Sequence, residues 1–413
     1  MSFDALGLCD ELVKAVTEQG YTQPTPIQVE AIPVVLRLRD VMAVANTGTG
    51  KTAGFTLPMV QLLSGGAIAQ PKSVRALVIT PTRELAAQVA QNVQDYSRHT
   101  NISSAVVFGG VRIEPQIAQL ATGVDVLVAT PGRLVDLYNQ QAINFNQLEL
   151  LVLDEADRML DLGFIDDIRH IQTLLPSERQ TLMFSATFSD EIKSLAKGML
   201  NNPQLIEVSP VNSTVDTVKQ KIYPVDKTRK SEALIYLLKK HQWRQVLVFS
   251  RTKQGADSLV TQLNNAGINS ASIHANRTQH ARTHALNGFK SGEIKVLVAT
   301  DIASRGIDVN QLPCVINLDL PYVAEDYVHR IGRTGRAGTA GLAISLFSID
   351  ESNQLQAIER LLGRTLAREV LPNFAPSEKK AVSKFDDDEY GNFEPDPEPR
   401  SGKGKSQKRK GKR

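Results

Sequence analysis

A stretch that begins at Ala45 reads ANTGTGKT, a combination of glycine, lysine and threonine that can hold a phosphate group. The usual phosphate-loop pattern is G-x-x-x-x-G-K-[ST], so Ala45 replaces its first glycine. Gly48 and Gly50 would let the backbone approach phosphate oxygens. Lys51 would reach the β- and γ-phosphates, and Thr52 would ligate Mg²⁺. The alternative is a glycine turn with an exposed lysine. As a phosphate loop, the stretch would contact the nucleotide through Ala45, Asn46, Thr47, Gly48, Thr49, Gly50, Lys51 and Thr52.

A second candidate for chemistry is LLVLDEAD, in which four apolar residues precede Asp154 and Glu155. The apolar run predicts a buried strand, and open α/β sheets bind ligands at the carboxyl ends of their strands. Asp154 would hold Mg²⁺, directly or through water, as the second metal ligand that a phosphate loop needs. Glu155 is placed to orient or deprotonate an attacking water as a general base. The alternative is that both acids cap the following helix.

Cations that could neutralise transition-state charge occur in HRIGRTGR, which carries Arg330, Arg333 and Arg336. Spaced arginines on a loop suit bidentate phosphate contacts, and we expect Arg333 and Arg336 to act in catalysis beside Lys51. An arginine finger contributes several orders of magnitude in rate. A finger from a second lobe would make hydrolysis depend on lobe closure. A basic surface loop is the alternative.

These residues need a scaffold, and short apolar runs between amphipathic segments predict an α/β fold. Amphipathic segments such as RELAAQVAQNVQDYSRH (83–99) are predicted helices. Continuous apolar runs indicate parallel strands that are covered on both faces. The strands predicted in the first series are VMAVA (41–45), ALVIT (76–80), DVLVAT (125–130), LLVLD (150–154) and TLMF (181–184).

A second α/β series follows the first. The pentapeptide VLVAT occurs once in each series, at 126–130 and at 296–300. Its recurrence at equivalent places suggests two related lobes. The strands predicted in the second series are QVLVFS (245–250), KVLVAT (295–300), CVINLD (314–319) and LAISLF (342–347).

The composition is that of a globular protein, with 413 residues, 42% hydrophobic and 22% charged, enough for two or three domains with cores. Only Cys9 and Cys314 are present, which argues against disulfides or a cysteine metal site and favours a reducing cytosol. We see neither the apolar region of a signal peptide nor a run long enough to span a membrane. We therefore expect a cytoplasmic protein without a membrane partner.

The domain organisation follows from changes in composition. We expect domains at 1–208 and 218–372, joined by a polar, proline-bearing linker at 209–217. A disordered tail is expected at 373–413, where the composition changes from about Pro376. The tail is first acidic and then strongly basic, and neither part can build a core. The net charge of +3 does not predict nucleic acid, but clustered Lys and Arg attract phosphates. We interpret the basic end as a nucleic-acid tether, with a merely solvated tail as the alternative.

The order of these motifs resembles the DEAD-box ATP-dependent RNA helicases of helicase superfamily 2, most of all the small bacterial RhlE-type members. The resemblance runs from Phe3 to about Leu371. It implies two tandem RecA-like domains, each a parallel sheet flanked by helices, with ATP and Mg²⁺ as cofactors. It rests on GYTQPTPIQ (20–28), ANTGTGKT, PTRELAAQ (81–88), GG (109–110), TPGR (130–133), DEAD (154–157), SAT (185–187), VFSRT (248–252), TDIASRGID (300–308) and HRIGRTGR (329–336).

The resemblance implies further roles around the nucleotide. Gln28 would read the adenine edge, because a side-chain amide can pair with adenine N6 and N7. Ser185 and Thr187 match the motif that links hydrolysis to strand separation. The remaining residues that the resemblance assigns to the nucleotide are Phe3, Tyr21 and Thr25 in the first lobe and Asp308 in the second.

By the same resemblance, RNA would lie across both lobes. Small residues and backbone N–H groups let phosphates approach, and arginines supply charge, so such contacts are largely independent of base sequence. The implied contact residues are Pro81, Thr82, Arg83, Gly109, Gly110, Thr130, Gly132 and Arg133 in the first lobe, and Arg251, Gln279, Arg282, Thr300 and Asp301 in the second.

Three residues depart from the common family pattern. Asn46 stands where glutamine is usual, Ser304 where alanine is common, and Ala275 where glycine is common. Each replacement is small and none removes a ligand, so we expect tuning of activity and not its loss.

The motifs leave three functions open. The first is an ATP-dependent RNA helicase that locally unwinds short duplexes and hydrolyses ATP in response to RNA. The second is an ATP-gated RNA clamp or remodelling scaffold with little unwinding. A DNA helicase is the third, and the GYTQPTPIQ and DEAD motifs argue against it. RNA is thus the expected partner, and the resemblance adds ribosomal-precursor or RNA-decay assemblies.

Overall fold

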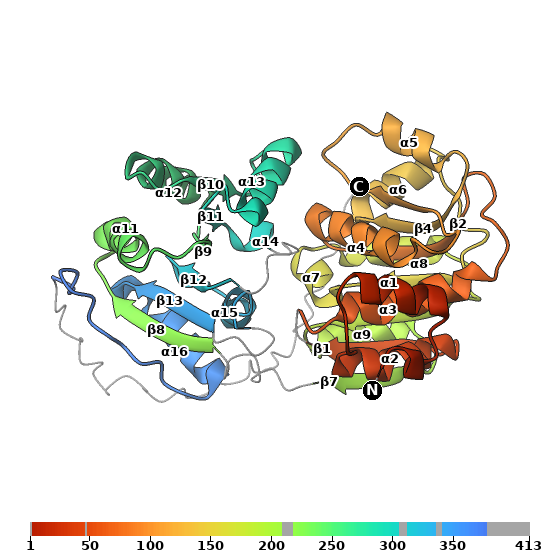
Figure 1. Cartoon of the computed structure of the whole chain (residues 1–413), viewed down its shortest axis with the longest axis horizontal. Helices are drawn as coiled ribbons and strands as arrows, with labels where there is room; N and C mark the ends of the chain where they lie inside the picture. Colours follow the sequence, from red (N-terminus) through yellow and green to blue (C-terminus); the bar gives the residue numbers. More distant parts are fainter. Residues whose placement is uncertain (1, 46–47, 209–217, 305–311, 336–340, 378–413) are drawn as a thin grey trace, which may run out of the picture. The chain divides into compact units, whose positions relative to one another are not determined.

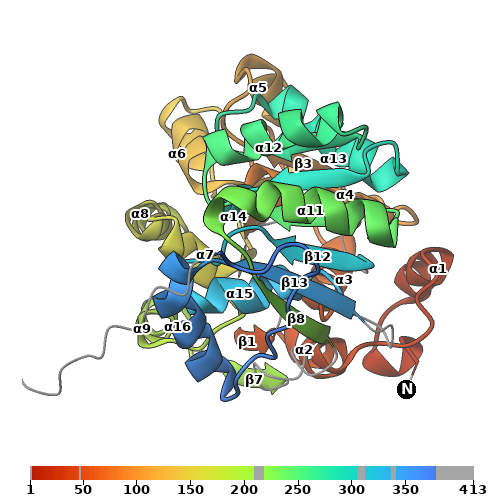
Figure 2. The same cartoon turned by 90° about the vertical axis from the view of Figure 1, so that its left-hand side faces the viewer.

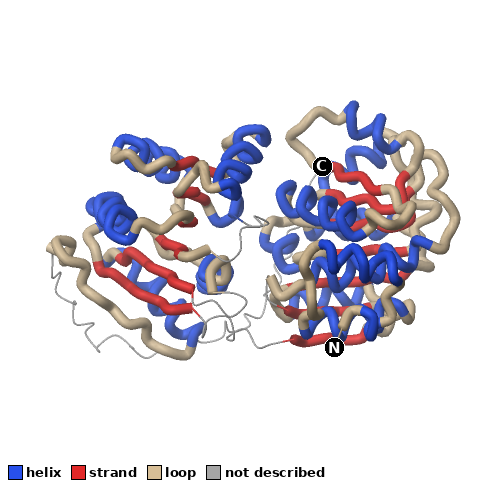
Figure 3. The backbone as a smooth tube through the Cα atoms, in the orientation of Figure 1, coloured by secondary structure: helices blue, strands red, loops and turns tan. Residues whose placement is uncertain are grey.

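The computed structural model describes residues 2–45, 48–208, 218–304, 312–335 and 341–377. The strands of this part of the chain form two all-parallel sheets, one of seven strands and one of six (Figures 1 and 3). Helices flank both sheets, which confirms the expected α/β class with two parallel sheets. We call residues up to Val208 lobe 1 and those from Val218 to Ser377 lobe 2.

Lobe 1 contains the seven-stranded sheet. Its strands are β1 (Val41–Ala45), β2 (Val74–Ile79), β3 (Ser104–Val107), β4 (Val124–Ala129), β5 (Leu150–Leu153), β6 (Gln180–Ser185) and β7 (Gln204–Val208), and they lie in the order β3-β4-β2-β5-β6-β1-β7. Its helices are α1 (Asp10–Glu18), α2 (Pro26–Leu36), α3 (Lys51–Ser64), α4 (Arg83–Tyr96), α5 (Glu114–Leu120), α6 (Pro131–Asn139), α7 (Ala156–Asp161), α8 (Ile165–Leu174) and α9 (Asp190–Met199), and a short 3-10 helix, η1, spans Asp4–Leu6.

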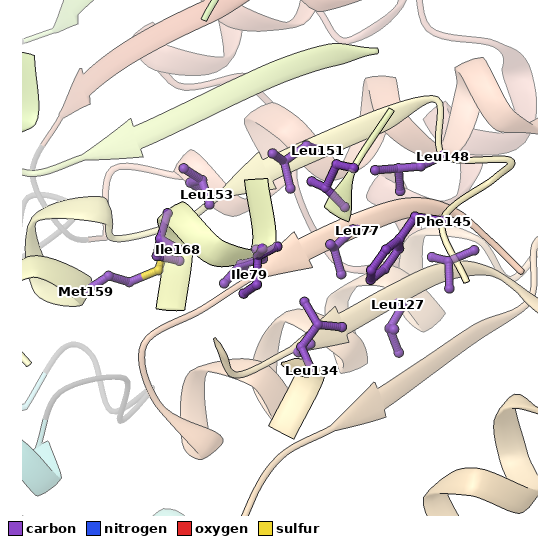
Figure 4. Close-up of a cluster of buried hydrophobic side chains, with 14 of the residues drawn as sticks. Leu77, Ile79, Leu127, Leu134, Phe145, Leu148, Leu151, Leu153, Met159 and Ile168 are labelled. Atoms are coloured by element: carbon purple, nitrogen blue, oxygen red, sulfur yellow. The ribbon is translucent and has the colours of Figure 1, made fainter. Parts of the chain in front are cut away.

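The central strands of lobe 1 are buried on both faces, as continuous apolar runs predict. Along β2, Leu77 and Ile79 point into one cluster, together with side chains of α6, α7 and α8 (Figure 4). Ala76 and Val78 point into the opposite cluster, with α2, α3 and α4. This alternation follows from the two-residue period of a strand. The strand ends are therefore fixed between two packed layers, which makes them a rigid base for a site.

Lobe 2 contains the six-stranded sheet. Its strands are β8 (Val218–Pro224), β9 (Val246–Phe249), β10 (Ser270–Ile273), β11 (Val296–Ala299), β12 (Cys314–Asn317) and β13 (Gly341–Phe347), and they lie in the order β10-β11-β9-β12-β13-β8. Its helices are α11 (Lys230–His241), α12 (Lys253–Asn265), α13 (Gln279–Ser291), α14 (Asp301–Ser304), α15 (Ala324–Ile331) and α16 (Ser352–Leu362), with short 3-10 helices η2 (Lys227–Arg229) and η3 (Ile349–Glu351). Figure 2 shows α11 lying over one face of this sheet.

The repeated pentapeptide VLVAT marks corresponding strands in the two sheets. Its first copy runs through β4 and its second copy through β11. Each of these strands is the second from the edge of its sheet, next to β3 and next to β10. The expectation of two related lobes is thereby supported by topology as well as by sequence.

The nine predicted strands appear within a residue or two of the expected positions, but the chain boundaries need one correction. The linker predicted at 209–217 lies outside the described residues. The tail was predicted from residue 373, but Asn373 and Phe374 make contacts within lobe 2. Phe374 is buried in lobe 2, with its ring 5.6 Å from that of Tyr236 and tilted to it by 46°, and the Asn373 carbonyl accepts a hydrogen bond from Arg229. Residues from 378 onward are outside the described part.

No helix among the described residues combines the length and the apolar character that crossing a membrane requires.

Candidate active site and nucleic-acid interface

The predicted site in lobe 1 gathers at the carboxyl ends of three neighbouring strands. Strands β5, β6 and β1 lie side by side in the sheet, and all three run in the same direction. Asp154 follows β5, Ser185 ends β6, and Ala45 ends β1 at the start of the phosphate loop. Because the strands are parallel, these residues meet at the carboxyl ends of the strands, which is where open α/β sheets bind ligands.

The phosphate loop leads directly into α3, as the motif requires. Gly50 precedes the helix with φ of 93°, a left-handed conformation that favours glycine. Helix α3 is held by Phe55 and Met59, which are fully buried, and this fixes the position of Lys51 at its first turn. The Lys51 ammonium is itself buried and donates a hydrogen bond of 2.7 Å to the Ala45 carbonyl across the loop. A phosphate that bound here would take over this donor.

Gln28 closes the loop from the side of α2. The Thr25 backbone N–H donates to Gln28 Oε1 at 2.9 Å, and Gln28 Nε2 donates to the Gly50 carbonyl at 3.1 Å. A Cβ at Gly50 would lie 2.4 Å from Gln28 Nε2, so only glycine leaves room for this amide. Each amide atom keeps a further hydrogen or lone pair for a ligand. Gln28 thus couples the predicted adenine-reading position to the phosphate loop.

The two predicted aromatics of the nucleotide site lie in different environments. Phe3 is 5% exposed and packs with Ile32 and Leu57 in a core cluster beneath α2 and α3. Tyr21 is 47% exposed, with its ring 6.5 Å from that of Tyr96. Tyr21 can therefore contact a ligand directly, whereas Phe3 supports the helices that carry the site.

Asp154 and Glu155 are both buried, and Asp154 lies close enough to Lys51 to feel its charge. Asp154 is 3% exposed, and burial, followed by the negative charge of Glu155, raises the pKa of its carboxyl to about 7, although Lys51 opposes the shift. Glu155 has φ of 54°, a conformation that costs a non-glycine residue about 1–3 kcal/mol and that is common at functional sites. Two buried carboxylates with one lysine nearby leave negative charge that a divalent cation would neutralise.

The donor set fits Mg²⁺ in particular. No group of three or more His, Cys, Asp or Glu side chains that could hold a metal occurs among the described residues. Magnesium is commonly bound by one or two carboxylates, with the remaining positions filled by water and substrate phosphates. Asp154 and Thr52, at the first turn of α3, are the residues that would hold it.

The third acid of the DEAD run, Asp157, was not singled out from the sequence. Its carboxylate accepts a hydrogen bond of 3.1 Å from the Ala186 backbone N–H. Next to it, the fully buried Ser185 hydroxyl accepts from the Thr187 N–H at 3.2 Å. The Asp157 contact thus joins the acid run after β5 to the predicted coupling segment after β6. The partner lies 29 residues away, so spacing alone could not reveal it.

A cavity of about 470 Å³ gathers many of the predicted RNA contacts. Gly110, next in sequence to the lining residue Gly109, has φ of 77°, a left-handed conformation that favours glycine. Ala275, one of the three departures from the family pattern, also lines the cavity. The lining contains the predicted residues Pro81, Thr82, Arg83, Gly109, Thr130, Gly132, Arg133 and Arg282, and also Glu84, Asp136, Leu162 and Phe164, which sequence reasoning did not identify.

Side chains of the predicted RNA contacts take part in contacts between the two lobes. Arg282 forms an ion pair of 2.7 Å with the buried carboxylate of Glu84. Gln279 donates to Glu84 at 3.1 Å and accepts from Arg83 at 3.5 Å. Glu84 is the residue through which two of these three contacts run.

A second ion pair connects the acid run with lobe 2. Arg158, the residue after Asp157, is buried and lies 3.0 Å from Asp326 on α15. Helix α15 carries the first part of HRIGRTGR. The contact therefore links the segment that holds Asp154 and Glu155 to the segment with the predicted catalytic arginines.

The arginine-rich segment differs from the expected loop. Arg330 lies on α15, is 2% exposed and forms a bidentate ion pair with Asp301 at 2.6 and 2.7 Å. Its guanidinium also donates to Asn317 at 3.0 Å, so this arginine positions elements of lobe 2 and does not serve as a free phosphate ligand. Asp301, expected to contact RNA, is the carboxylate that holds it. The sequence pattern missed this because Arg330 shares the buried face of α15 with Tyr327 and Ile331.

Other predicted residues of lobe 2 are only partly described. Arg251 forms an ion pair of 2.6 Å with buried Glu351 and lies over the Tyr322 ring at 4.8 Å. Thr300 directly precedes α14, and Arg333 follows the end of α15. The expectations for Asn46, Thr47, Asp308 and Arg336, and for the side chain of Ser304, lie outside the described residues.

A phosphate loop, a buried acid run and a second α/β lobe that carries arginines are the features of a two-lobed, nucleotide-hydrolysing protein. Residues 25–195 match the family described as DEAD/DEAH box helicase, and residues 229–338 match the helicase conserved C-terminal domain. The chain belongs to the DEAD-box helicases.

Individual relatives agree with this assignment. The ATP-dependent RNA helicase RhlB of Pseudomonas syringae pv. tomato is 42% identical over 376 residues, which covers 90% of this chain and 95% of that protein. RNA helicase CrhR of Synechocystis is 42% identical over 385 residues, 93% of this chain and 77% of that protein. A solved structure of S. cerevisiae Dbp5 bound to RNA and ADP BeF3 is 32% identical with a TM-score of 0.80, covering 89% of this chain and 95% of that one. The fold is therefore that of tandem RecA-like domains, while the RhlE subtype stays a prediction.

Proposed function

We propose that this protein is an RNA-dependent ATPase that uses ATP to separate short RNA duplexes. The observation that carries the proposal is the buried pair Asp154 and Glu155 beside Lys51, joined through Asp157 to the Ser185–Thr187 segment. Two relatives are named RNA helicases, and the Dbp5 structure contains RNA with ADP BeF3, which supports the choice of ligands.

ATP binding would use residues of lobe 1. Lys51 would exchange the Ala45 carbonyl for β- and γ-phosphate oxygens, while Gln28 would pair with the adenine edge and keep its bond to Gly50. The remaining expected nucleotide residues, including Asp308 and Arg336, keep the roles that the family resemblance implies.

Hydrolysis would depend on Glu155. Glu155 precedes α7 and has a left-handed backbone conformation. Its carboxylate would orient or deprotonate the attacking water. When bound, Mg²⁺ neutralises charge on the phosphates, and Asp154 and Thr52 would hold it. Arg333 would stabilise the charge of the transition state from lobe 2.

RNA would bind at the cavity that contains Arg83, Arg133 and Arg282, whose guanidinium groups suit phosphates. Arg282 and Gln279 also contact Glu84 of lobe 1, so RNA that bound these side chains would compete with contacts between the lobes. This competition gives RNA a direct route to change how the lobes meet, and hence to stimulate hydrolysis.

The test is a duplex-unwinding assay with wild-type protein and Glu155→Gln. Wild-type protein should separate a short RNA duplex only with ATP. Glu155→Gln should still bind ATP and RNA, but its turnover should fall by orders of magnitude. Wild-type turnover in Glu155→Gln would refute the general-base role. RNA-stimulated hydrolysis without duplex separation would identify an ATP-gated clamp instead. The compartment, and assembly with ribosomal precursors or RNA-decay enzymes, stay predictions.

A further inference from the structure

The end of α11 carries a group of basic and aromatic side chains that the predicted RNA contacts do not include. Lys239, Lys240 and His241 form the last turn of α11, and Trp243 and Arg244 follow before β9 begins. The two lysines, His241 and Arg244 are exposed, and Trp243 is half-buried. We call these five residues the α11 basic surface.

The aromatic members of the α11 basic surface form a flat stack. The rings of His241 and Trp243 lie 4.6 Å apart with an angle of 12° between their planes. Burial, followed by the charges of Lys240 and Lys221, lowers the pKa of His241, so its ring is uncharged at neutral pH. Lys240 itself lies over the Tyr236 ring at 5.6 Å. The result is an uncharged aromatic platform with ammonium groups at its edge.

The cations of the α11 basic surface lack acidic partners in the described part of the chain. Neighbouring cations are paired: Lys221 lies 2.7 Å from Glu369, and Arg229 lies 3.6 Å from Glu232. No carboxylate of the described residues forms an ion pair with Lys239, Lys240 or Arg244. Lysines at a helix C-terminus also interact favourably with the helix dipole, but this is worth only about 0.3–1 kcal/mol each and gives no reason for Arg244 or for the His241–Trp243 stack.

The α11 basic surface and the predicted RNA contacts of lobe 2 lie at opposite ends of the sheet's strands. Trp243 and Arg244 precede the first residue of β9, whereas Arg251 follows its last residue. Thr300 likewise follows β11, which is parallel to β9. The four residues of β9, at about 3.3 Å each, separate the two ends by at least about 13 Å. One nucleotide cannot contact both places.

We propose that the α11 basic surface is a second RNA-binding surface, which holds single-stranded RNA that extends beyond the predicted contact residues. Its lysines and arginine bind phosphates, and the His241–Trp243 stack offers a face to a base. Single-stranded RNA is bound by this combination of cations and aromatic rings. An acidic protein segment would use the cations but leave the aromatic platform without a function. The inference rests on the proposed RNA-dependent activity and extends it to longer RNA.

The test compares Lys239→Glu/Lys240→Glu with a control of the same charge change. The control is Lys14→Glu/Lys197→Glu, which alters two exposed helical lysines of lobe 1. Affinity is measured over a range of salt for a fluorescent single-stranded RNA of about 30 nucleotides and for one of about 10, since one binding module covers about 4–16 nucleotides. Lys239→Gln/Lys240→Gln repeats the measurement without introducing acids.

We expect the α11 variants to weaken binding of the long RNA. The slope of log affinity against log salt should fall by about 1.4, because each lost phosphate contact removes about 0.7 for single strands. Binding of the short RNA, and the ATP hydrolysis that it stimulates, should match wild type. Trp243 is the single tryptophan of the chain, so its fluorescence should change with long RNA and not with short RNA.

Three results would overturn the proposal. They are a wild-type salt slope in both α11 variants, an equal loss in the lobe 1 control, and no change of Trp243 fluorescence with long RNA. The first of these would leave the surface to an acidic protein partner. Failure of the proposed function looks different, because wild-type ATP hydrolysis would then not respond even to short RNA.

Discussion

Asp154→Asn should change the pH dependence of stability in the nucleotide-free protein. Burial and the neighbouring Glu155 raise the pKa of Asp154 from its ordinary value of 3.8 to about 7. The folded chain therefore binds a proton at Asp154 between about pH 4 and pH 7, and the unfolded chain does not. Stability due to this group is present below pH 4 and is lost as the pH rises through 7.

The magnitude follows from the pKa difference. At about 1.4 kcal/mol per pH unit, the difference corresponds to roughly 4 kcal/mol of unfolding free energy at pH 8. Asparagine has the same shape but no charge, so Asp154→Asn should match wild type near pH 4 and exceed it by up to that amount at pH 8. The assay is urea unfolding followed by circular dichroism, at several pH values, in EDTA and without nucleotide.

Asp125→Asn provides a control of opposite sign in the same lobe. Burial alone would raise the pKa of Asp125, but hydrogen bonds from Ser103 and the Arg75 guanidinium hold it below its ordinary value. The stabilisation by Asp125 is complete above about pH 4 and is lost as the pH falls through its lowered pKa, so Asp125→Asn should be less stable than wild type by a constant amount from pH 4 to pH 8. If the difference in unfolding free energy between Asp154→Asn and wild type stayed constant from pH 4 to pH 8, the raised pKa of Asp154 would be refuted.

The other predictions concern binding. Lys51→Ala should weaken ATP binding itself, because the described part of the loop loses its only buried ammonium group. Calorimetry with a non-hydrolysable ATP analogue measures this affinity, and an unchanged affinity would contradict the prediction. Gly50→Ala should also weaken ATP binding, since a Cβ would meet the Gln28 amide at 2.4 Å in a left-handed backbone, whereas Gly65→Ala, in open space, should not. Deleting residues 401–413 should lower RNA affinity and flatten its salt dependence while sparing basal ATP hydrolysis; an unchanged slope would show that the tail is no tether.

The sequence predicted the inner strands well and the edge strands not at all. The four strands that the pattern missed are β3, β7, β8 and β10, and each forms the edge of its sheet. An inner strand is covered on both faces and is continuously apolar, but β7 alternates between exposed and buried positions and β8 carries two lysines. Such strands are defined by their neighbours, which a local pattern does not contain.

The same limit applies to the site. Motif residues that contact ligands through their own type and spacing, such as Lys51 and Asp154, could be found from the sequence. Residues that act by holding another segment could not, because their partners are distant. Glu84 meets Gln279 across 195 residues, and Arg158 meets Asp326 across 168. Arg330 shows the converse error, since regular spacing suggested a ligand where burial made an ion pair.

The central claim is that RNA bound across the lobes stimulates ATP hydrolysis at Asp154 and Glu155. The most direct measurement is the steady-state rate of ATP hydrolysis by the full chain, with Mg²⁺, at saturating ATP, with and without single-stranded RNA. We predict that RNA raises the rate, that DNA of the same sequence does so far less, and that Glu155→Gln abolishes the response. The same rate with and without RNA would contradict the account.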